Sequence, residues 1–446
     1  MYTFPKGLYS DIRIEDVFET KIELTDGRLD EIKEKEYKGA FIRVFDGKRW
    51  FYSATSDIEG IQNELDALAK LADVNDDINN HPVVKKFEVN KGDFCEFVDD
   101  KDIANTQIEE KKELLEKYTD LIKGDENISS LKSFYVDSRK KKTFYSSKGA
   151  DLVFDFQMAG LRLIFNLKNG DKLFTENYDC SSANFKDLRN RDSELKEQFR
   201  KAVAFLNNAE DVTAGKYTVI LSPLAAGVFA HESFGHKSES DFMVGDETMR
   251  KEWTMGKKVG ADLLSIIDDG HPEGSGHITF DDEGTRTKKT YLIKDGVLSG
   301  RLHSSSTAAY LEEDVTGNGR SINFEFEPIV RMTTTYIDKG KKTLNELISE
   351  VENGILVETI KHGSGMSTFT IAPSLAYAIK NGKIAQPLKI SVVSGNVFKT
   401  LNEIDGVSDA IKLHSFILGG CGKMEQFPLS VGFGGPYVRV NNLDVQ

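Results

Sequence analysis

Two histidines five residues apart, His231 and His236, impose the tightest local constraint on how this chain folds. Four residues along an ideal α-helix separate two side chains by about 40°, but five steps of about 100° separate them by roughly 140°. Both imidazoles can therefore face one point only if the helix rewinds locally. Gly235 precedes the second histidine and would permit this, because glycine adopts backbone angles that other residues avoid.

The helix that carries these histidines has a well-defined predicted start. A strand over residues 217–221 comes first, and Ser222 then provides a favoured N-cap. Pro223 suits the first helical position, where a backbone N–H would have no helical partner. His231 falls on the apolar stripe of this helix, so we expect it to be buried, with Glu232 about 100° round the helix.

Two imidazoles and a carboxylate within a turn and a half of helix are typical of zinc hydrolases. A catalytic zinc ion takes three protein ligands and keeps a fourth position for water, so a third ligand is needed. Cys421 is the leading candidate, because flanking glycines let its sulfur approach a metal closely. Glu232 is the natural general base. The sequence leaves open as third ligands Glu239, Asp241, His271, His277 and His303.

The length of 446 residues favours two domains, because one ordinary hydrophobic core does not extend over so long a chain. We predict an α+β fold with an N-terminal α/β domain over residues 1–210, built on a mainly antiparallel sheet. The polar stretch 207–215 marks the boundary. Residues 211–446 are predicted to form a mostly-β domain that carries the metal-binding helix.

Local signals predict further details of the N-terminal domain. Capping boxes predict that helices begin at Ser56, with Glu59, and at Thr106, with Glu109. The basic run Arg139-Lys140-Lys141-Lys142, beside a turn signal, is predicted to be a solvated hairpin turn.

Composition and charge limit the class of partner. The formal charge of −14 disfavours nucleic acid or an anionic membrane, since phosphate binding relies on clustered Lys and Arg. No apolar stretch approaches the roughly 18 residues that a membrane span needs. The N-terminus lacks the features of a secretory signal, and three scattered cysteines do not form a disulfide framework. We therefore predict a cytoplasmic protein.

Other polar segments give weaker predictions. Asp281 and Asp282 belong to an acidic stretch without the ligand spacing of a calcium loop, so we expect a turn or a supporting role beside the metal ligands, as for Glu239 and Asp241. The segment Gly363-Ser364-Gly365 is predicted to be a turn. Arg320 and Arg331 are candidates for binding a substrate carboxylate through paired N–H groups.

The chain resembles the TldD/PmbA family of metallopeptidases over nearly its whole length. The resemblance rests on five motifs in the family's order: His231-Glu232-x-x-x-His236 with Glu239 and Asp241, Asp281-Asp282-Glu283-Gly284, Thr316-Gly317-Asn318-Gly319-Arg320, Arg331-Met332-Thr333-x-Thr335-Tyr336, and Cys421-Gly422-Lys423. It implies a C-terminal domain of curved antiparallel sheet. It also implies Zn2+ held by His231, His236 and Cys421, with Glu232 as the catalytic carboxylate.

The resemblance further implies a dimer whose chamber admits peptides or unfolded polypeptides. The dimer is either a homodimer or a heterodimer with a TldE/PmbA-like subunit that lacks the motif. This chain keeps every motif residue, so we expect it to be the active subunit, a zinc-dependent peptidase. The alternative is a non-catalytic partner or scaffold subunit with a structural metal site, and a third hypothesis is a hydrolase of non-peptide amides.

Overall fold

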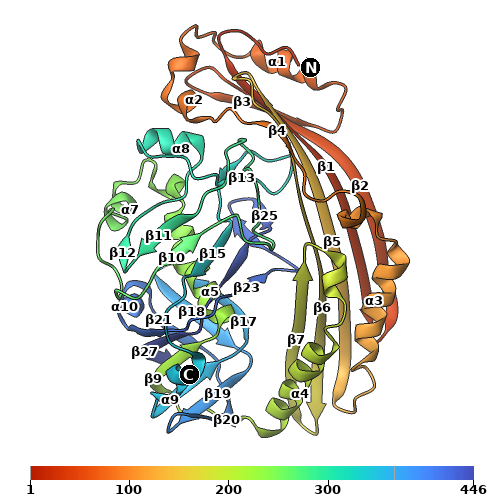
Figure 1. Cartoon of the computed structure of the whole chain (residues 1–446), viewed down its shortest axis with the longest axis vertical. Coiled ribbons are helices and arrows are strands. Elements are labelled where there is room, and N and C mark those ends of the chain that lie inside the picture. Colours follow the sequence, from red (N-terminus) through yellow and green to blue (C-terminus); the bar gives the residue numbers. More distant parts are fainter. Residues whose placement is uncertain (1, 366) are drawn as a thin grey trace.

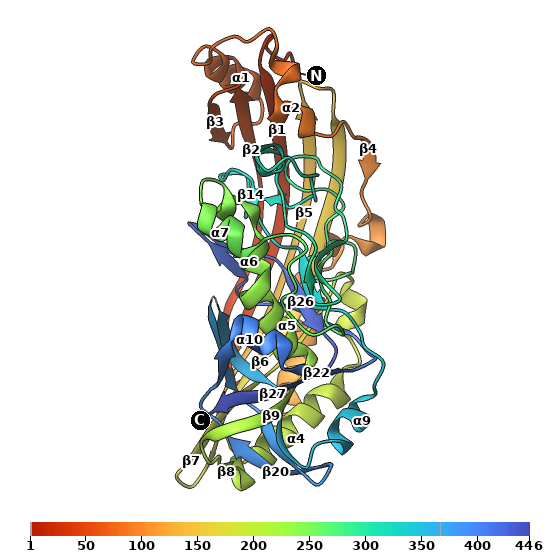
Figure 2. The same cartoon turned by 90° about the vertical axis from the view of Figure 1, so that its left-hand side faces the viewer.

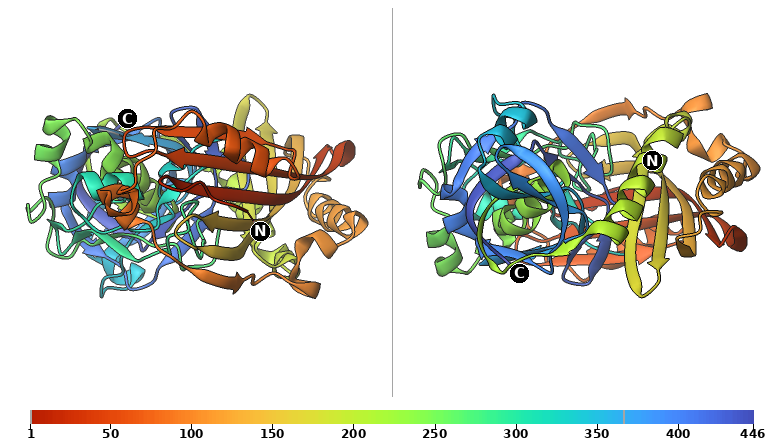
Figure 3. Two further views of the ribbon diagram at one scale, coloured as in Figure 1. Left: turned by 90° about the horizontal axis from the view of Figure 1, so that it is seen from above. Right: turned by 90° about the horizontal axis from the view of Figure 1, so that it is seen from below.

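A computed structural model describes residues 2–365 and 367–446 and has an α+β fold. A sheet of very long strands forms one side of the molecule, and the C-terminal half packs along it (Figures 1 and 2). Viewed along the long axis, the two halves lie side by side (Figure 3). Among the described helices, none combines the length and the apolar character that a membrane crossing requires.

The N-terminal half contains a seven-stranded sheet in the order β3-β2-β1-β5-β6-β4, with β7 also pairing with β6. Neighbouring strands are antiparallel except for β4 and β6, as expected for a mainly antiparallel sheet. Helices α3 and α4 cover the face of the sheet away from the C-terminal half (Figure 1). The strands are β1 Tyr9–Thr25, β2 Arg28–Phe45, β3 Trp50–Thr55, β4 Lys91–Phe94, β5 Ile128–Ser146, β6 Asp151–Asn169 and β7 Lys172–Ser182. The helices are α1 Ile61–Ala69, α2 Pro82–Lys86, α3 Ile108–Asp120 and α4 Asp192–Asn208, with short 3-10 turns η1 Ile78–Asn80, η2 Asp99–Lys101, η3 Ile103–Asn105 and η4 Phe185–Leu188.

Both predicted capping boxes of this half are wrong. Helix α1 begins at Ile61, five residues after Ser56, and α3 begins at Ile108 without a side-chain cap. The physical reason at α1 is a competing turn, in which the Asp57 carboxylate accepts a hydrogen bond from the Gly60 amide at 3.1 Å. Such local side-chain bonds compete with helix formation.

The predicted hairpin turn at the basic run is also wrong, because β5 continues through it from Ile128 to Ser146. Lys140 donates a hydrogen bond to the Ile322 carbonyl at 2.9 Å, and Lys142 Nζ lies 2.5 Å from Asp282 Oδ1. Lys140 and Lys142 therefore satisfy carbonyl and carboxylate groups of the C-terminal half, while Arg139 pairs with Asp16 and Asp102 of the N-terminal half. Sequence charge alone does not reveal a partner that lies 140 residues away.

The C-terminal half is dominated by two mixed sheets with mostly antiparallel neighbours. The larger has the order β17-β18-β21-β27-β9-β16-β19-β20-β8, with β22 on β27, and the smaller has the order β12-β11-β10-β15-β26-β23. The pairs β9–β16, β8–β20 and β15–β26 are parallel. The strands are β8 Glu210–Asp211, β9 Gly215–Leu221, β10 Ile266–Asp268, β11 Thr290–Lys294, β12 Val297–Leu298, β13 Gly319–Arg320, β14 Ile329–Val330, β15 Thr334–Ile337, β16 Asn353–Val357, β17 Ile360–Gly365, β18 Thr368–Pro373, β19 Ala376–Lys380, β20 Lys383–Lys389, β21 Val393–Asn396, β22 Ile404–Val407, β23 Lys412–Ser415, β24 Cys421–Lys423, β25 Gln426–Leu429, β26 Gly432–Gly435 and β27 Val438–Val445.

Helix α5 lies at the centre of this half and positions the histidine segment. It packs so closely on β26 that a Cβ on Gly227 would come within 2.3 Å of the Gly434 backbone nitrogen. The surrounding hydrophobic cluster draws its residues from Val212 to Val445. The predicted domain boundary after residue 210 stays a prediction. The remaining helical elements are α5 Pro223–Ala230, η5 His231–Gly235, α6 His236–Ser238, η6 Ser240–Met243, α7 Glu247–Glu252, α8 Ser305–Tyr310, α9 Leu344–Ser349 and α10 Val397–Asn402.

We predict that Lys142→Met lowers the free energy of unfolding by about 3 kcal/mol, because it leaves the buried Asp282 carboxylate without its nearest cation. Lys141→Met is the matched control, since neighbouring residues of a strand point to opposite faces. Urea denaturation of both variants measures the effect. Equal destabilisation by the two substitutions would contradict a specific ion pair between the halves.

Candidate metal centre

The helix that carries the histidines begins as predicted. The Ser222 side chain accepts a hydrogen bond from the Ala225 amide, and Pro223 occupies the first helical position. Seven of the eight residues of α5 are buried. This rigid, buried helix fixes the direction from which the following segment enters the site.

The helix rewinds at the histidines, as the five-residue spacing predicts. Residues His231–Gly235 form a π-helical turn, and the two imidazole centroids lie 5.2 Å apart. The role of Gly235 differs from the expected one, because its backbone angles of φ −52° and ψ −59° are ordinary helical values. A Cβ at this position would instead lie 1.9 Å from the Met332 sulfur. Gly235 therefore provides space for Met332.

Cys421 completes the group with the two histidines. Its Sγ lies 3.4 Å from His236 Nε2, and one ligand atom from each of the three residues lies within 4.8 Å of the others. Burial raises the pKa of the Cys421 thiol, but hydrogen bonds and charge from His231 and His236 outweigh this effect and lower it to about 5. The thiol is therefore poised as the thiolate that a metal requires.

The donor set fits a metal such as zinc. One sulfur and two imidazole nitrogens are ligands that zinc prefers, and a separation near 3.4 Å is what tetrahedral coordination at about 2.0 to 2.3 Å produces. His231 Nδ1 is buried without a hydrogen-bond partner among the described residues. A buried polar atom in this state favours a ligand at the site.

Glu239 and Asp241 lie beside the three-residue group. Glu239 contacts His236 of the group directly, and Lys423 pairs with both carboxylates. Glu239 is fully buried, and its Oε2 lies 3.0 Å from His236 Nδ1. Lys423 Nζ lies 3.2 Å from Glu239 and 2.7 Å from Asp241. Burial raises the pKa of Glu239, but the hydrogen bond from His236 and the Lys423 charge outweigh it and leave the pKa lowered. Glu239 therefore turns His236 Nε2 toward Cys421.

Two buried arginines hold the chain around Cys421. The Arg331 guanidinium donates hydrogen bonds to the carbonyls of Cys421 at 2.7 Å and Gln426 at 3.2 Å. Arg320 donates to the carbonyls of Met332 and Ser430. These contacts give both arginines a supporting role, and binding of a substrate carboxylate by either stays a prediction.

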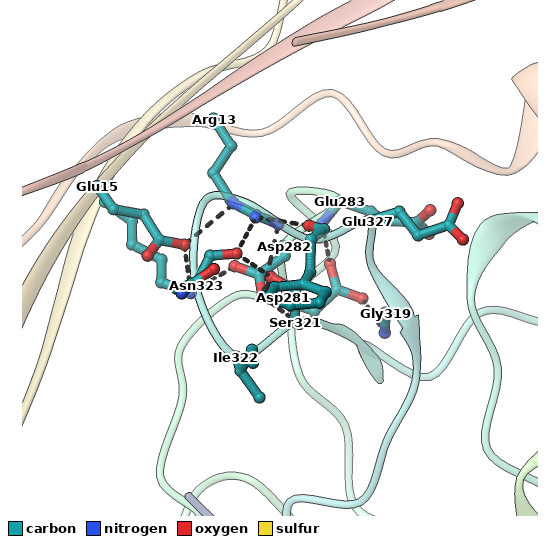
Figure 4. Close-up of polar contacts among 12 residues, drawn as sticks. Arg13, Glu15, Asp281, Asp282, Glu283, Gly319, Ser321, Ile322, Asn323 and Glu327 are labelled. Carbon is teal, nitrogen blue, oxygen red and sulfur yellow. Dashed lines mark hydrogen bonds and ion pairs between the residues drawn. The ribbon is translucent and has the colours of Figure 1, made fainter. Parts of the chain in front are cut away.

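Asp281 and Asp282 lie where the two halves of the molecule meet. The Asp281 carboxylate accepts hydrogen bonds from the amides of Glu283, Thr285 and Gly319, so it fixes its own turn. Arg13 and Glu15 extend from the N-terminal sheet toward this turn, and Arg13 lies 3.8 Å from Asp282 (Figure 4). Asp282 therefore joins the two halves of the molecule, whereas Asp281 holds the turn that carries it.

Glu232 is half-buried and borders an open cleft of about 530 Å³. The same cleft is lined by His236, by Ser364 and Gly365 of β17, by Phe242 and Thr368, and by residues 422–424. Ser364 and Gly365 lie in a strand, so the predicted turn over residues 363–365 is wrong. The cleft gives a ligand direct access to the carboxylate and to one imidazole.

Sequence reasoning gave no role to Lys423, although this side chain joins Glu239, Asp241 and the Val330 carbonyl. An available signal was its spacing. Lys423 follows Cys421 by two residues, and alternate residues of a strand share a face.

We predict that Glu239→Gln weakens metal binding about 10- to 100-fold, because the neutral amide orients and polarises His236 less strongly than the carboxylate. Competition with a chromophoric chelator measures the affinity. Glu252→Gln, whose half-exposed side chain lies 3.9 Å from Lys237, is the control and should leave the affinity unchanged. Unaltered affinity in the Glu239 variant would contradict the orienting role.

We predict that Gly235→Ala destabilises the fold by about 1 to 3 kcal/mol through its clash with Met332. Adding Met332→Val removes the clashing sulfur, so the double variant should be more stable than the sum of the two single changes predicts. Denaturant titration of the four proteins measures this coupling. Strict additivity would show that Gly235 is needed for some reason other than space.

Comparisons with known proteins identify the family of this chain. Residues 214–446 match the family model described as the PmbA/TldA metallopeptidase C-terminal domain, and residues 10–73 match domain 1 of the same family. A metalloprotease of Synechocystis is 31% identical over 442 residues, covering 98% of this chain and 94% of its own length. A protein named zinc metalloprotease TldD homolog, from Saccharolobus solfataricus, is 27% identical and covers 98% of this chain and 96% of its own.

Solved structures share the fold. A Thermotoga maritima protein superposes with a TM-score of 0.78 at 21% identity, over 99% of this chain and 96% of that one. TldE from Thermococcus kodakarensis superposes with a TM-score of 0.75 at 17% identity, over 98% of this chain and 96% of that one. With the two family matches and the similarity along nearly the whole length, this chain belongs to the PmbA/TldD family of metallopeptidases.

Proposed function

We propose that this protein is a zinc-dependent peptidase that hydrolyses peptides or unstructured polypeptide segments, with Glu232 as the general base. The observation that carries the proposal is that Glu232 and His236 border the same open cleft, beside the His231, His236 and Cys421 group. A carboxylate that shares a cleft with candidate metal ligands is in the right place for proton transfer during hydrolysis.

His231, His236 and Cys421 would hold the zinc ion. When bound, zinc supplies Lewis acidity, which polarises a carbonyl and lowers the pKa of water. The name of the Saccharolobus relative supports zinc, as does the sulfur and nitrogen donor set. Glu239 and Lys423 keep His236 in one orientation, so the ligands are arranged before substrate arrives.

Glu232 would accept a proton from the attacking water and deliver it to the leaving amine. The neighbouring residues suit this task. Gly365 passes close to Glu232, since a Cβ on Gly365 would lie 3.4 Å from the Glu232 Cβ. This close approach places β17 alongside the backbone that carries Glu232.

The surroundings of Glu232 favour an extended substrate. Strand β17 lies at the end of the ten-stranded sheet, and its Ser364 and Gly365 line the cleft. An extended peptide can add to a sheet edge through its backbone hydrogen bonds, whereas the backbone of a folded protein is already paired. We therefore propose peptides or unfolded segments as the substrate class.

We also propose that the chain works as a dimer in the cytoplasm, either with a second copy or with a TldE/PmbA-like subunit that lacks the metal motif. The fold shared with TldE of Thermococcus kodakarensis supports a partner of similar architecture. Native mass spectrometry of the purified protein, alone and mixed with such a subunit, distinguishes the two assemblies.

We predict that Glu232→Gln retains the metal but reduces peptide cleavage at least 100-fold, because an amide cannot accept the proton. Metal content and cleavage of an unstructured peptide library, followed by mass spectrometry, measure the two effects. Glu247→Gln, at an exposed position on α7, is the control. Undiminished cleavage by the Glu232 variant would refute the assignment of this residue.

The alternative of a scaffold subunit with a structural metal gives a different result. In that case the unaltered protein cuts no peptide in the library, alone or with a partner, and removal of the metal unfolds the C-terminal half.

A further inference from the structure

An apolar side chain stands at an unfavourable place beside the candidate active site. Met424 occupies the tip of the tight hairpin between β24 and β25, with φ at +52° and with 75% of its surface exposed. Asn and Gly are the usual residues in this left-handed conformation, and a bulky residue there is strained. This backbone strain opposes stability, so a functional reason for Met424 is expected.

Phe242 supplies a second apolar surface from a different part of the chain. It lies in η6, shortly after the histidine segment, and 38% of its surface is exposed. Its ring centroid lies 4.5 Å from Lys423 Nζ, a cation–π contact with a side chain that is only 3% exposed. The buried lysine thus restrains Phe242 and precedes Met424 directly in the chain.

The two apolar residues line the same cleft as the groups assigned to catalysis. Phe242 and Met424 border it together with Glu232 and His236. Single exposed apolar residues are common and need no explanation. Phe242 and Met424 come from separate segments, are connected through Lys423 and share a cleft with Glu232. Together they form a surface that a bound peptide would meet.

We propose that Phe242 and Met424 form a subsite for an apolar side chain, such as Leu, Met or Phe, of a substrate residue close to the cleaved bond. This inference rests on the proposed peptidase function and adds a preference to it. Peptides with an apolar residue at that position bury it against the ring and the thioether, whereas a charged residue loses hydration there. Discrimination by one such contact is about 10- to 200-fold in kcat/KM.

Met424→Asn provides a sharp test, because Asn tolerates the left-handed conformation and keeps the hairpin intact. The zinc-loaded protein and this variant are given an unstructured peptide library, and mass spectrometry maps the cleaved bonds. We expect the unaltered protein to favour apolar residues at one position relative to the cut. The variant should lose about tenfold in kcat/KM for those peptides and keep its rate on peptides with Ser or Gly there.

Phe427→Thr is the matched control, because Phe427 lies on the same hairpin and is 60% exposed but is outside the cleft lining. It should leave the preference unchanged. Cleavage without any positional preference, an unchanged preference in Met424→Asn, or an equal loss in Phe427→Thr would overturn the subsite and leave the peptidase function standing. A change in native mass in Met424→Asn with its preference intact would instead assign Met424 to a subunit interface.

A binding measurement separates failure of the subsite from failure of the peptidase. Glu232→Gln, loaded with zinc, is titrated with a Leu-containing peptide and with its Ser counterpart. The Leu peptide should bind about tenfold more tightly, and Met424→Asn in the same background should abolish the difference. Equal affinities overturn the subsite. Absence of cleavage by the unaltered protein, alone and with a TldE/PmbA-like subunit, overturns the peptidase function even where binding is preferential, and with it the role of the subsite in cleavage.

Discussion

The contact between the Cys421 thiol and the two imidazoles is the interaction around which the C-terminal half is organised. It joins a helix near the middle of the chain to a hairpin 185 residues later. The π-helical turn turns His231 toward His236, and the lowered pKa of the thiol follows from both imidazoles. The π-helical turn and the lowered pKa of the thiol therefore depend on each other, because the turn brings both imidazoles to the thiol.

Buried cations maintain this contact from outside. Arg331 binds the carbonyl of Cys421, while Lys423 pairs with the carboxylates that flank His236. Removing such groups from water is costly unless hydrogen bonds and opposite charges replace the lost hydration. Here both conditions are met, so the hairpin that carries Cys421 is fixed on the side facing the protein and open on the side facing the cleft. The hairpin thus carries both the candidate ligand Cys421 and residues that line the cleft.

The same principle governs the junction of the two halves. The Lys142 ammonium and the Arg13 guanidinium of the N-terminal sheet meet Asp282 of the C-terminal half, and the charges together lower the pKa of that carboxylate despite its burial. A run of lysines that would be a solvated turn in isolation is therefore part of a long strand. The Asp282 carboxylate also accepts a hydrogen bond from the Ser321 amide, directly after β13. Arg320 of β13 in turn donates to the Ser430 carbonyl, in the segment that follows the Cys421 hairpin.

The sequence by itself determined the features that depend on neighbouring residues. The Ser222 cap and the rewound helix at His231 follow from local sterics and hydrogen bonding, and both are present. The grouping of Cys421 with the two histidines, the buried role of Lys142 and the need for space at Gly235 depended on distant partners. Only the tertiary structure decided these, because charge neutralisation, ligand geometry and packing against Met332 arise between residues that the chain order keeps far apart.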